Sequence, residues 1–315
     1  MTRCWVAVGL ASLAACGAPP ANEPRAIGGR PQPLAPPYLG QVASDRPTMF
    51  APGVVSGPAT DLNAAFSPDG MELYFSRKDA TDQIATIMVV RRTGDHWTAP
   101  EVAPFSGRYS DVDPMFSPDG SRLYFSSYRP RDAGAVDPVA DADLWFVERR
   151  GRGFGDPVHL PAPVNTPADD LYPSLTRDGT LYYARWDPGP GTGDLFRARP
   201  AGDGYQVDRM PAPVNSESVE YDPFIAPDES YLVFVSSRPG GHGGGDLYLS
   251  FRAGAAWTEP RNLGAPVSSE ARDYCPVVSP DGNYLFFTST RSDASDPGDG
   301  NVYWLTSGFL QRAGE

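Results

Sequence analysis

Cysteine is scarce in this chain of 315 residues, which contains only Cys4, Cys16 and Cys275. The first two lie in an N-terminal stretch typical of an export signal, so only Cys275 belongs to the folded part. A single thiol excludes an intramolecular disulfide there, and Cys275 is most simply a small buried side chain. The folded part must therefore rely on its apolar core, which a chain with 40% apolar residues can build.

Histidine and basic residues are also few. The three histidines, His96, His159 and His242, are scattered without metal-binding spacing, and no Gly-x-Ser-x-Gly stretch marks a hydrolase nucleophile. The chain has 26 basic and 39 acidic residues and a net charge of −13. This acidic excess argues against nucleic acid as a partner and against attachment to anionic lipid through the protein surface.

No apolar run is long enough to suggest a membrane-spanning helix in the N-terminal stretch, where the run from Trp5 to Leu13 follows Arg3. This pattern is typical of an export signal. Leu13-Ala14-Ala15-Cys16 resembles the lipobox of bacterial lipoproteins. The resemblance implies that residues 1–15 are removed and that Cys16 carries a lipid, whereas the alternative is an ordinary secretory signal.

The residues that follow the signal indicate where the lipid-anchored protein lies. By the same resemblance, Gly17 implies the outer membrane rather than the inner one, with the protein facing the periplasm. Residues 16–45 are rich in proline and alanine and predict a tether. We therefore expect the lipid alone to hold the chain in the cell envelope.

Proline and glycine are abundant, with 35 and 33 residues, and many of them lie in one repeated stretch. Its clearest copy runs from Phe116 to Ser127, and related copies carry their turns at Ser67, Thr176, Ala226 and Ser279. In the turn of the clearest copy, Pro118 fixes φ, Asp119 can bond the backbone ahead, and Gly120 accepts a positive φ. The copies recur about every 50 to 60 residues, a spacing that indicates a repeat architecture.

The sequence pattern of each unit predicts four short antiparallel strands, and repeated units of this kind are typical of the blades of a β-propeller. The fifth unit lacks its last strand, but residues 46–55 match residues 260–268, the corresponding part of the fourth unit. We therefore predict an all-β fold over residues 46–315, a propeller of five four-stranded blades closed by the N-terminal strand. Six blades are the alternative, because the spacing of the third unit is longer.

The repeated Ser-Pro-Asp-Gly turn with its Leu-Tyr-Phe-Ser-Ser strand resembles the Pro-Asp variant of WD-like repeats in TolB-like propellers and in many envelope lipoproteins. The resemblance covers about residues 46 to 306. It implies the propeller fold but no single activity, because such repeats serve in binding domains and also in hydrolases and lyases.

One acid occurs in every unit seven residues before the position of the turn proline, such as Pro118: Asp61, Asp111, Asp170, Glu220 and Asp273. A ring of such acids at the channel mouth could bind a cation or a basic peptide. We favour a structural clasp, in which each acid accepts hydrogen bonds from the neighbouring connector, because symmetric positions usually serve the repeat.

A second pattern places an arginine after the second strand of a unit and an acid before its third strand. Arg129 precedes Asp143, and Arg238 precedes Asp246. We predict that each such pair holds its hairpin together.

The loops between second and third strands differ most among units, and such loops often carry binding function. The candidate binding residues in them are Asp137, Asp141, His242, Asp293, Asp296 and Asp299. The aspartates could hold Ca²⁺, but they lack the spacing of an EF-hand loop, so we predict no cofactor or metal.

These observations favour a monomeric, lipid-anchored propeller that acts as a non-catalytic binding or scaffolding module for an envelope protein or a peptidoglycan-associated partner. We predict no catalytic residues and consider an enzyme less plausible. The alternative is a hydrolase or lyase acting on envelope saccharide or peptide. A pair of acids could act on a glycan, but no feature of the sequence singles one out.

Overall fold

The computed structural model of the protein describes residues 38–39, 41–79, 84–132, 135–189, 191–291 and 300–311. All of them lie in one of two units of the chain, Pro31–Glu315. The other unit, Met1–Arg30, lies outside the described residues, as do the predicted signal and lipidated Cys16.

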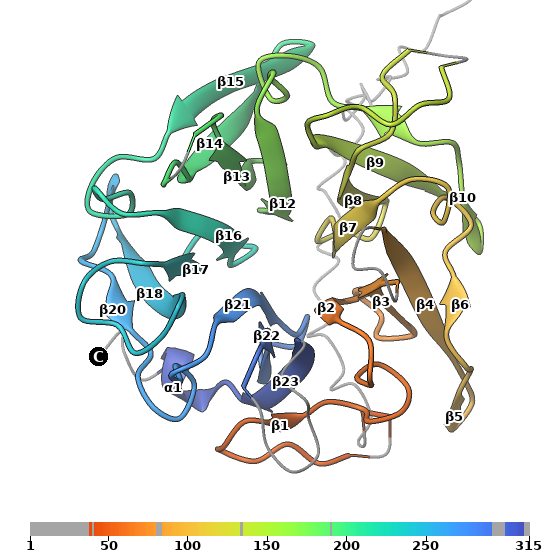
Figure 1. Ribbon diagram of the computed structural model, residues 1–315, viewed down its shortest axis with the longest axis horizontal. Helices are drawn as coiled ribbons and strands as arrows, with labels where there is room; N and C mark the ends of the chain where they lie inside the picture. The colour runs from red at the N-terminus through yellow and green to blue at the C-terminus, as the bar shows by residue number, and fades with distance from the viewer. Residues whose placement is uncertain are drawn as a thin grey trace, which may run out of the picture. The chain divides into compact units, whose positions relative to one another are not determined.

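Five antiparallel sheets, here called blades 1 to 5, lie around a common centre (Figure 1). Blade 1 consists of β2 (Asp61–Phe66), β3 (Glu72–Lys78), β4 (Ala85–Thr93), β5 (His96–Trp97) and β6 (Glu101–Val102). Blade 2 consists of β7 (Asp111–Phe116), β8 (Arg122–Ser127), β9 (Asp143–Arg150), β10 (Gly153–Phe154) and β11 (Val158–His159). Blade 3 consists of β12 (Asp169–Leu175), β13 (Leu181–Trp186), β14 (Asp194–Ala201) and β15 (Gly204–Arg209).

Blades 4 and 5 complete the ring. Blade 4 consists of β16 (Glu220–Ile225), β17 (Tyr231–Ser236), β18 (Asp246–Ala253), β19 (Ala256–Trp257) and β20 (Arg261–Asn262). Blade 5 consists of β21 (Asp273–Val278), β22 (Tyr284–Ser289), β23 (Asn301–Thr306) and β1 (Thr48–Met49). The predicted five-bladed, all-β fold is confirmed, and the alternative of six blades is wrong. Within the described ranges, the only helix is the four-residue α1 (Gly308–Gln311), and no helix is long and apolar enough to cross a membrane.

The repeated turn joins the first two strands of each blade. In blade 2, the Gly120 amide donates to the Ser117 carbonyl at 2.8 Å, and the Ser121 amide donates to Asp119 Oδ1 at 3.0 Å. Gly120 has a φ of 71°, a conformation that is energetically unfavourable for any residue with a Cβ atom. Asp119 and Gly120 thus have the roles predicted from the sequence.

The N-terminal strand closes the ring, as predicted. In β1, Thr48 lies opposite Trp304 and Met49 lies opposite Tyr303 of β23. Phe50 follows with no exposed surface, and its ring centroid lies 5.1 Å from that of Trp304. Because β1 completes blade 5, that blade has four strands in the order β21-β22-β23-β1, as blade 3 has four in the order β12-β13-β14-β15.

Aromatic side chains fill the spaces between blades. Tyr74 of β3 meets Phe116 of β7 edge to face, with the ring centroids 5.5 Å apart. Each such buried ring contributes about 1.5–3 kcal/mol relative to an exposed one. The packed blades hold their first strands, β2, β7, β12, β16 and β21, around the centre of the ring.

Candidate functional site

The five repeated acids are buried in the ring wall, and none has exposed surface. Each carboxylate forms an ion pair with an arginine of its own blade, at 2.6 to 3.2 Å. The pairs are Asp61–Arg77, Asp111–Arg129, Asp170–Arg185, Glu220–Arg238 and Asp273–Arg291. Burial raises the pKa of Asp61 and Asp170 to about 6, although the paired arginines oppose this shift.

Blade 5 illustrates the contacts of these acids with the preceding connector. Asp273 Oδ2 accepts hydrogen bonds from the backbone N–H and the hydroxyl of Ser269, at 2.7 and 2.8 Å. Arg291 donates to Asp273 Oδ1 and also to the carbonyl of Val267, at 2.7 and 2.6 Å. The carboxylate thus ties blade 5 to the connector that leads into it, and its oxygens are engaged within the wall.

The predicted partners of two arginines are wrong. Arg129 and Arg238 pair with the acids of their inner strands rather than with Asp143 and Asp246. The reason is local, because the Nε–H of Arg129 donates to Ser127 Oγ at 2.9 Å and so directs the guanidinium toward the inner strand. Asp143 instead contacts Arg131 and His159.

The candidate loop residues do not gather into one site. Asp137 is exposed, and Asp141 forms an ion pair with Arg131. The side chain of His242 is exposed, and its backbone N–H donates to Asp246 Oδ2 at 2.6 Å. The remaining candidates lie outside the described residues: Asp293, Asp296 and Asp299. In the part of the chain that the structure describes, no group of three or more His, Cys, Asp or Glu side chains could hold a metal ion.

A different set of residues meets at the centre of the ring. Two residues after each of the repeated acids, the first strand of each blade contains a bulge at which the pairing register shifts. The bulged residues have left-handed φ angles of 48° to 58°: Asn63, Asp113, Tyr172, Asp222 and Cys275. We call them the central column. A bulge redirects a side chain, and left-handed strain in residues other than glycine is concentrated at functional sites.

Contacts within the central column connect different blades. The Tyr172 hydroxyl donates to the carbonyl of Pro276 at 2.9 Å, which links blade 3 to blade 5. The Cys275 backbone N–H donates to Asp222 Oδ2 at 3.1 Å, which links blade 5 to blade 4. The column thus brings side chains from separate repeats to one place.

Two carboxyl groups of the column, Asp113 and Asp222, come from the non-adjacent blades 2 and 4. Asp113 is 8% exposed, and its pKa is raised well above the usual value by burial and then by the charge of Asp222. Burial raises the pKa of Asp222 to about 6, while Arg272 and the Cys275 N–H oppose this shift. Both carboxyl groups thus have raised pKa values, and the charge of Asp222 contributes to the shift of Asp113, an arrangement typical of acid–base sites.

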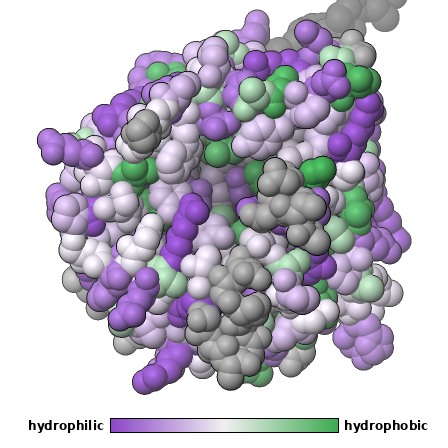
Figure 2. All heavy atoms as spheres, in the orientation of Figure 1, coloured by the Kyte–Doolittle hydropathy of each residue, from purple (hydrophilic) through white to green (hydrophobic). Residues whose placement is uncertain are grey.

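Aromatic and basic residues surround this pair. The positive charge of Lys78 lowers the pKa of Asp113, and Arg272 does the same for Asp222. Trp186 packs on Tyr221, the residue before Asp222, with the ring centroids 5.4 Å apart. Figure 2 shows one face of the propeller, which is hollowed between the loops near its centre.

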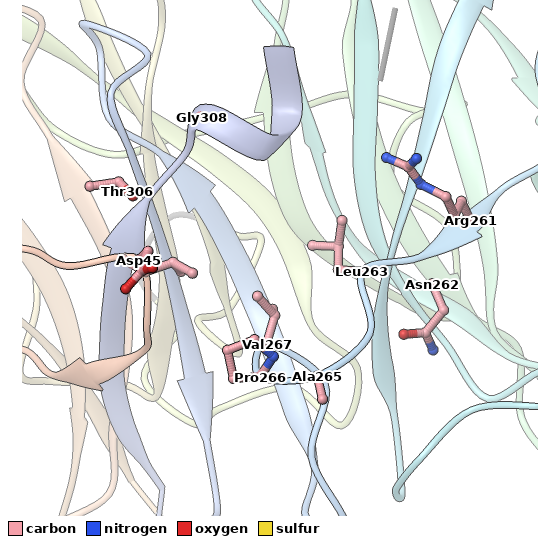
Figure 3. Close-up of a pocket in the computed structure, with 10 residues that line it drawn as sticks. Asp45, Arg261, Asn262, Leu263, Ala265, Pro266, Val267, Thr306 and Gly308 are labelled. Carbon is pink, nitrogen blue, oxygen red and sulfur yellow. The ribbon is translucent and has the colours of Figure 1, made fainter. Parts of the chain in front are cut away.

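A separate pocket of about 430 Å³ lies between blades 4 and 5 (Figure 3). Its lining includes Arg261 and Asn262 of β20 and Thr306 at the end of β23, but no residue of a first strand. It contains no pair of carboxyl groups, since Asp45 is the only acid in its lining. The chemistry therefore favours the central column as the candidate site.

No family model matches the chain, and no curated protein is similar to it. Among solved structures, a thermostable family-43 glycoside hydrolase aligns with a TM-score of 0.53 and 13% identity, over 81% of this chain and 91% of that one. The α-L-arabinofuranosidase of Lactobacillus brevis aligns with a TM-score of 0.51 and 13% identity, over 79% of this chain and 90% of that one. The chain shares its fold with glycoside hydrolases.

TolB of Acinetobacter baumannii is also similar, with a TM-score of 0.48 and 17% identity. The alignment covers 79% of this chain and 55% of the TolB chain, so this chain spans little more than half of that protein's length. The five blades of the structure confirm the propeller fold expected from the sequence resemblance, while the WD-like type of the repeat stays a prediction.

The expectation of a non-catalytic binding module is contradicted by these comparisons. The two glycoside hydrolases align over about nine tenths of their own chains, so a propeller of this size needs no added domain to be an enzyme. The acid pair Asp113 and Asp222 was also missed from the sequence. Its signal was the variation within the central column, where Asn, Asp, Tyr, Asp and Cys occupy one position of the repeat.

Proposed function

We propose that the protein is a hydrolase that cleaves a glycosidic bond at the centre of its propeller. The observation that carries the proposal is the pair of carboxyl groups of Asp113 and Asp222, which separate blades bring to the central column. The pKa of Asp113 is raised partly by the charge of Asp222, so Asp113 is the group that keeps its proton as general acid in the proposed reaction, and glycoside hydrolysis requires such a pair of an acid and a carboxylate.

The two side chains divide the reaction between them. Protonated Asp113 acts as the general acid and gives its proton to the leaving oxygen of the scissile bond. Ionised Asp222 acts on the other side, either as a base that takes a proton from the attacking water or as a nucleophile at the anomeric carbon. Proton NMR of the first product distinguishes these routes, because the first inverts and the second retains the anomeric configuration.

The proposed location follows from the N-terminal sequence. Cys16 carries a lipid in the outer membrane, and the propeller faces the periplasm as a monomer with TolB-like, WD-like repeats and no metal cofactor. The substrate is then a saccharide of the cell envelope. Metabolic labelling with an alkyne fatty acid tests the anchor, because wild-type protein should be labelled and Cys16→Ser should not.

The activity is tested with a panel of aryl glycosides and envelope polysaccharides. Asp113→Asn and Asp222→Asn should each lower kcat by at least about 100-fold, since each removes one proton-transfer group or nucleophile. Asp203→Asn, at an exposed turn, is the matched control and should keep full activity. Folded Asp113→Asn and Asp222→Asn variants with wild-type turnover would refute the assignment, as would a wild type that cleaves no glycoside in the panel.

A further inference from the structure

Arg272 breaks the symmetry of the propeller next to the acid pair. It immediately precedes the repeated acid of blade 5, where the other blades carry Thr60, Ser110, Asp169 and Val219. The repeat therefore does not require a cation at this position. Within the described ranges, Arg272 forms no ion pair, unlike the five arginines that pair with the repeated acids.

The side chain of Arg272 is held in place by aromatic residues. Its Nε–H donates to the hydroxyl of Tyr221 at 3.1 Å. The guanidinium carbon lies 4.5 Å from the ring centroid of Tyr274 and 5.2 Å from that of Tyr221. In the described part of the chain, no hydrogen bond engages its two terminal NH₂ groups, and the residue is exposed. These groups are available to a ligand.

The glycine-rich loop before β18 leaves room for Tyr221 and Arg272. A Cβ atom at Gly245 would lie 2.4 Å from the Tyr221 hydroxyl, closer than real Cβ contacts allow. The backbone of Gly245 also forms a parallel bridge with Arg272, and its carbonyl accepts the Asp273 N–H at 2.9 Å. Glycine thus lets the loop lie against the residues that orient the guanidinium.

Arg272 therefore lies next to Asp222 in a protein of net charge −13. Its Nε–H donates to the hydroxyl of Tyr221, the residue before Asp222, and its charge lowers the pKa of Asp222. A guanidinium fork binds a carboxylate through two parallel hydrogen bonds, and the neighbouring aromatic rings offer apolar faces to a sugar ring. A neutral sugar would leave the terminal groups of Arg272 without a charged partner.

We infer that Arg272 binds the carboxylate of an acidic saccharide such as a hexuronic acid, and so sets the substrate class. The inference rests on the proposed function for the reaction itself. The binding of the carboxylate can be measured without turnover.

The test is isothermal titration calorimetry of the purified full chain with D-glucuronate, D-galacturonate, D-glucose and D-glucose 6-phosphate. At least one uronate should bind more tightly than glucose, and Arg272→Gln should weaken its binding by about 10- to 100-fold, the usual worth of a hydrogen bond to a charged group. Arg261→Gln removes an exposed arginine away from the ring centre and is the matched control, with unchanged binding expected. Thermal unfolding of each variant establishes that it is folded.

The outcomes separate this inference from the proposed function. Uronate binding that depends on Arg272, without cleavage of any glycoside, would support the inference and refute the hydrolase. Cleavage of neutral glycosides that depends on Asp113 and Asp222, with no preference for uronates over glucose, would support the hydrolase and overturn the inference. Tighter binding of glucose 6-phosphate than of both uronates would also overturn the assignment of a carboxylate.

Discussion

Replacing Arg129 by methionine tests the energetic role of the buried ion pairs. Arg129 is only 7% exposed, and it donates to Asp111 at 2.7 Å, to Ser127 Oγ at 2.9 Å and to the Phe105 carbonyl at 3.1 Å. Asp111 has no exposed surface, so Arg129→Met would leave its carboxylate buried beside an apolar side chain. Losing one partner of a buried pair typically costs about 3–5 kcal/mol, and we expect a loss of that size in the free energy of unfolding.

The assay is urea unfolding followed by tryptophan fluorescence, with a double variant and a surface control. Arg129→Met combined with Asp111→Asn should be more stable than Arg129→Met alone, because no buried charge is left without a partner. Glu148→Gln breaks a pair of the same blade whose side chains are 40% and 49% exposed, and it should cost about 0.2–1 kcal/mol. If Arg129→Met costs no more than Glu148→Gln, the reasoning about the buried pairs is refuted.

The remaining predictions concern pH and ring closure. The kcat/KM for a cleaved glycoside should rise near pH 6 as Asp222 loses its proton and fall at higher pH as Asp113 does, which a pH–rate profile measures. Burial raises the pKa of Asp61 and Asp170 from 3.8 to about 6, so between about pH 6 and 4 the folded chain binds protons that the unfolded chain does not. The free energy of unfolding, measured with urea, should therefore increase as the pH falls through this window. Phe50→Ala should lower the free energy of unfolding by about 3–5 kcal/mol, because it empties a fully buried site at the ring closure.

Each of these predictions has an outcome that contradicts it. A kcat/KM that is independent of pH between about 5 and 7 would contradict the roles of the acid pair. Lower stability at about pH 5 than at pH 7 would contradict the raised pKa values of the buried acids. Val42→Ala, at a side chain 84% exposed, is the control for Phe50→Ala and should change stability by less than about 0.5 kcal/mol.

The fold could be predicted because its determinants are local and repeated. Pro118, Asp119 and Gly120 form a turn through contacts within a few residues, and four other units repeat that arrangement. The closing strand could be predicted because residues 46–55 match a segment whose place in the repeat is known.

The site could not be predicted in the same way, because its residues depend on differences among the blades. Asp113 and Asp222 lie far apart in the sequence, and the bulges that direct them to the centre leave no distinct mark in composition. The partner of Arg129 was missed for a related reason. Sequence proximity pointed to Asp143 across the hairpin, whereas the hydrogen bond to Ser127 turns the side chain toward Asp111.

The pairing of β1 with β23 also has a consequence for the order of events during synthesis. Thr48 leaves the ribosome long before Trp304, its partner in the finished ring, so β1 has no strand to join while the first four blades are being made. The early strand must stay unpaired, or pair only transiently, until almost the whole propeller has emerged. A chain interrupted before β23 would expose both the edge of β22 and an unpaired β1, and such edges invite association between copies.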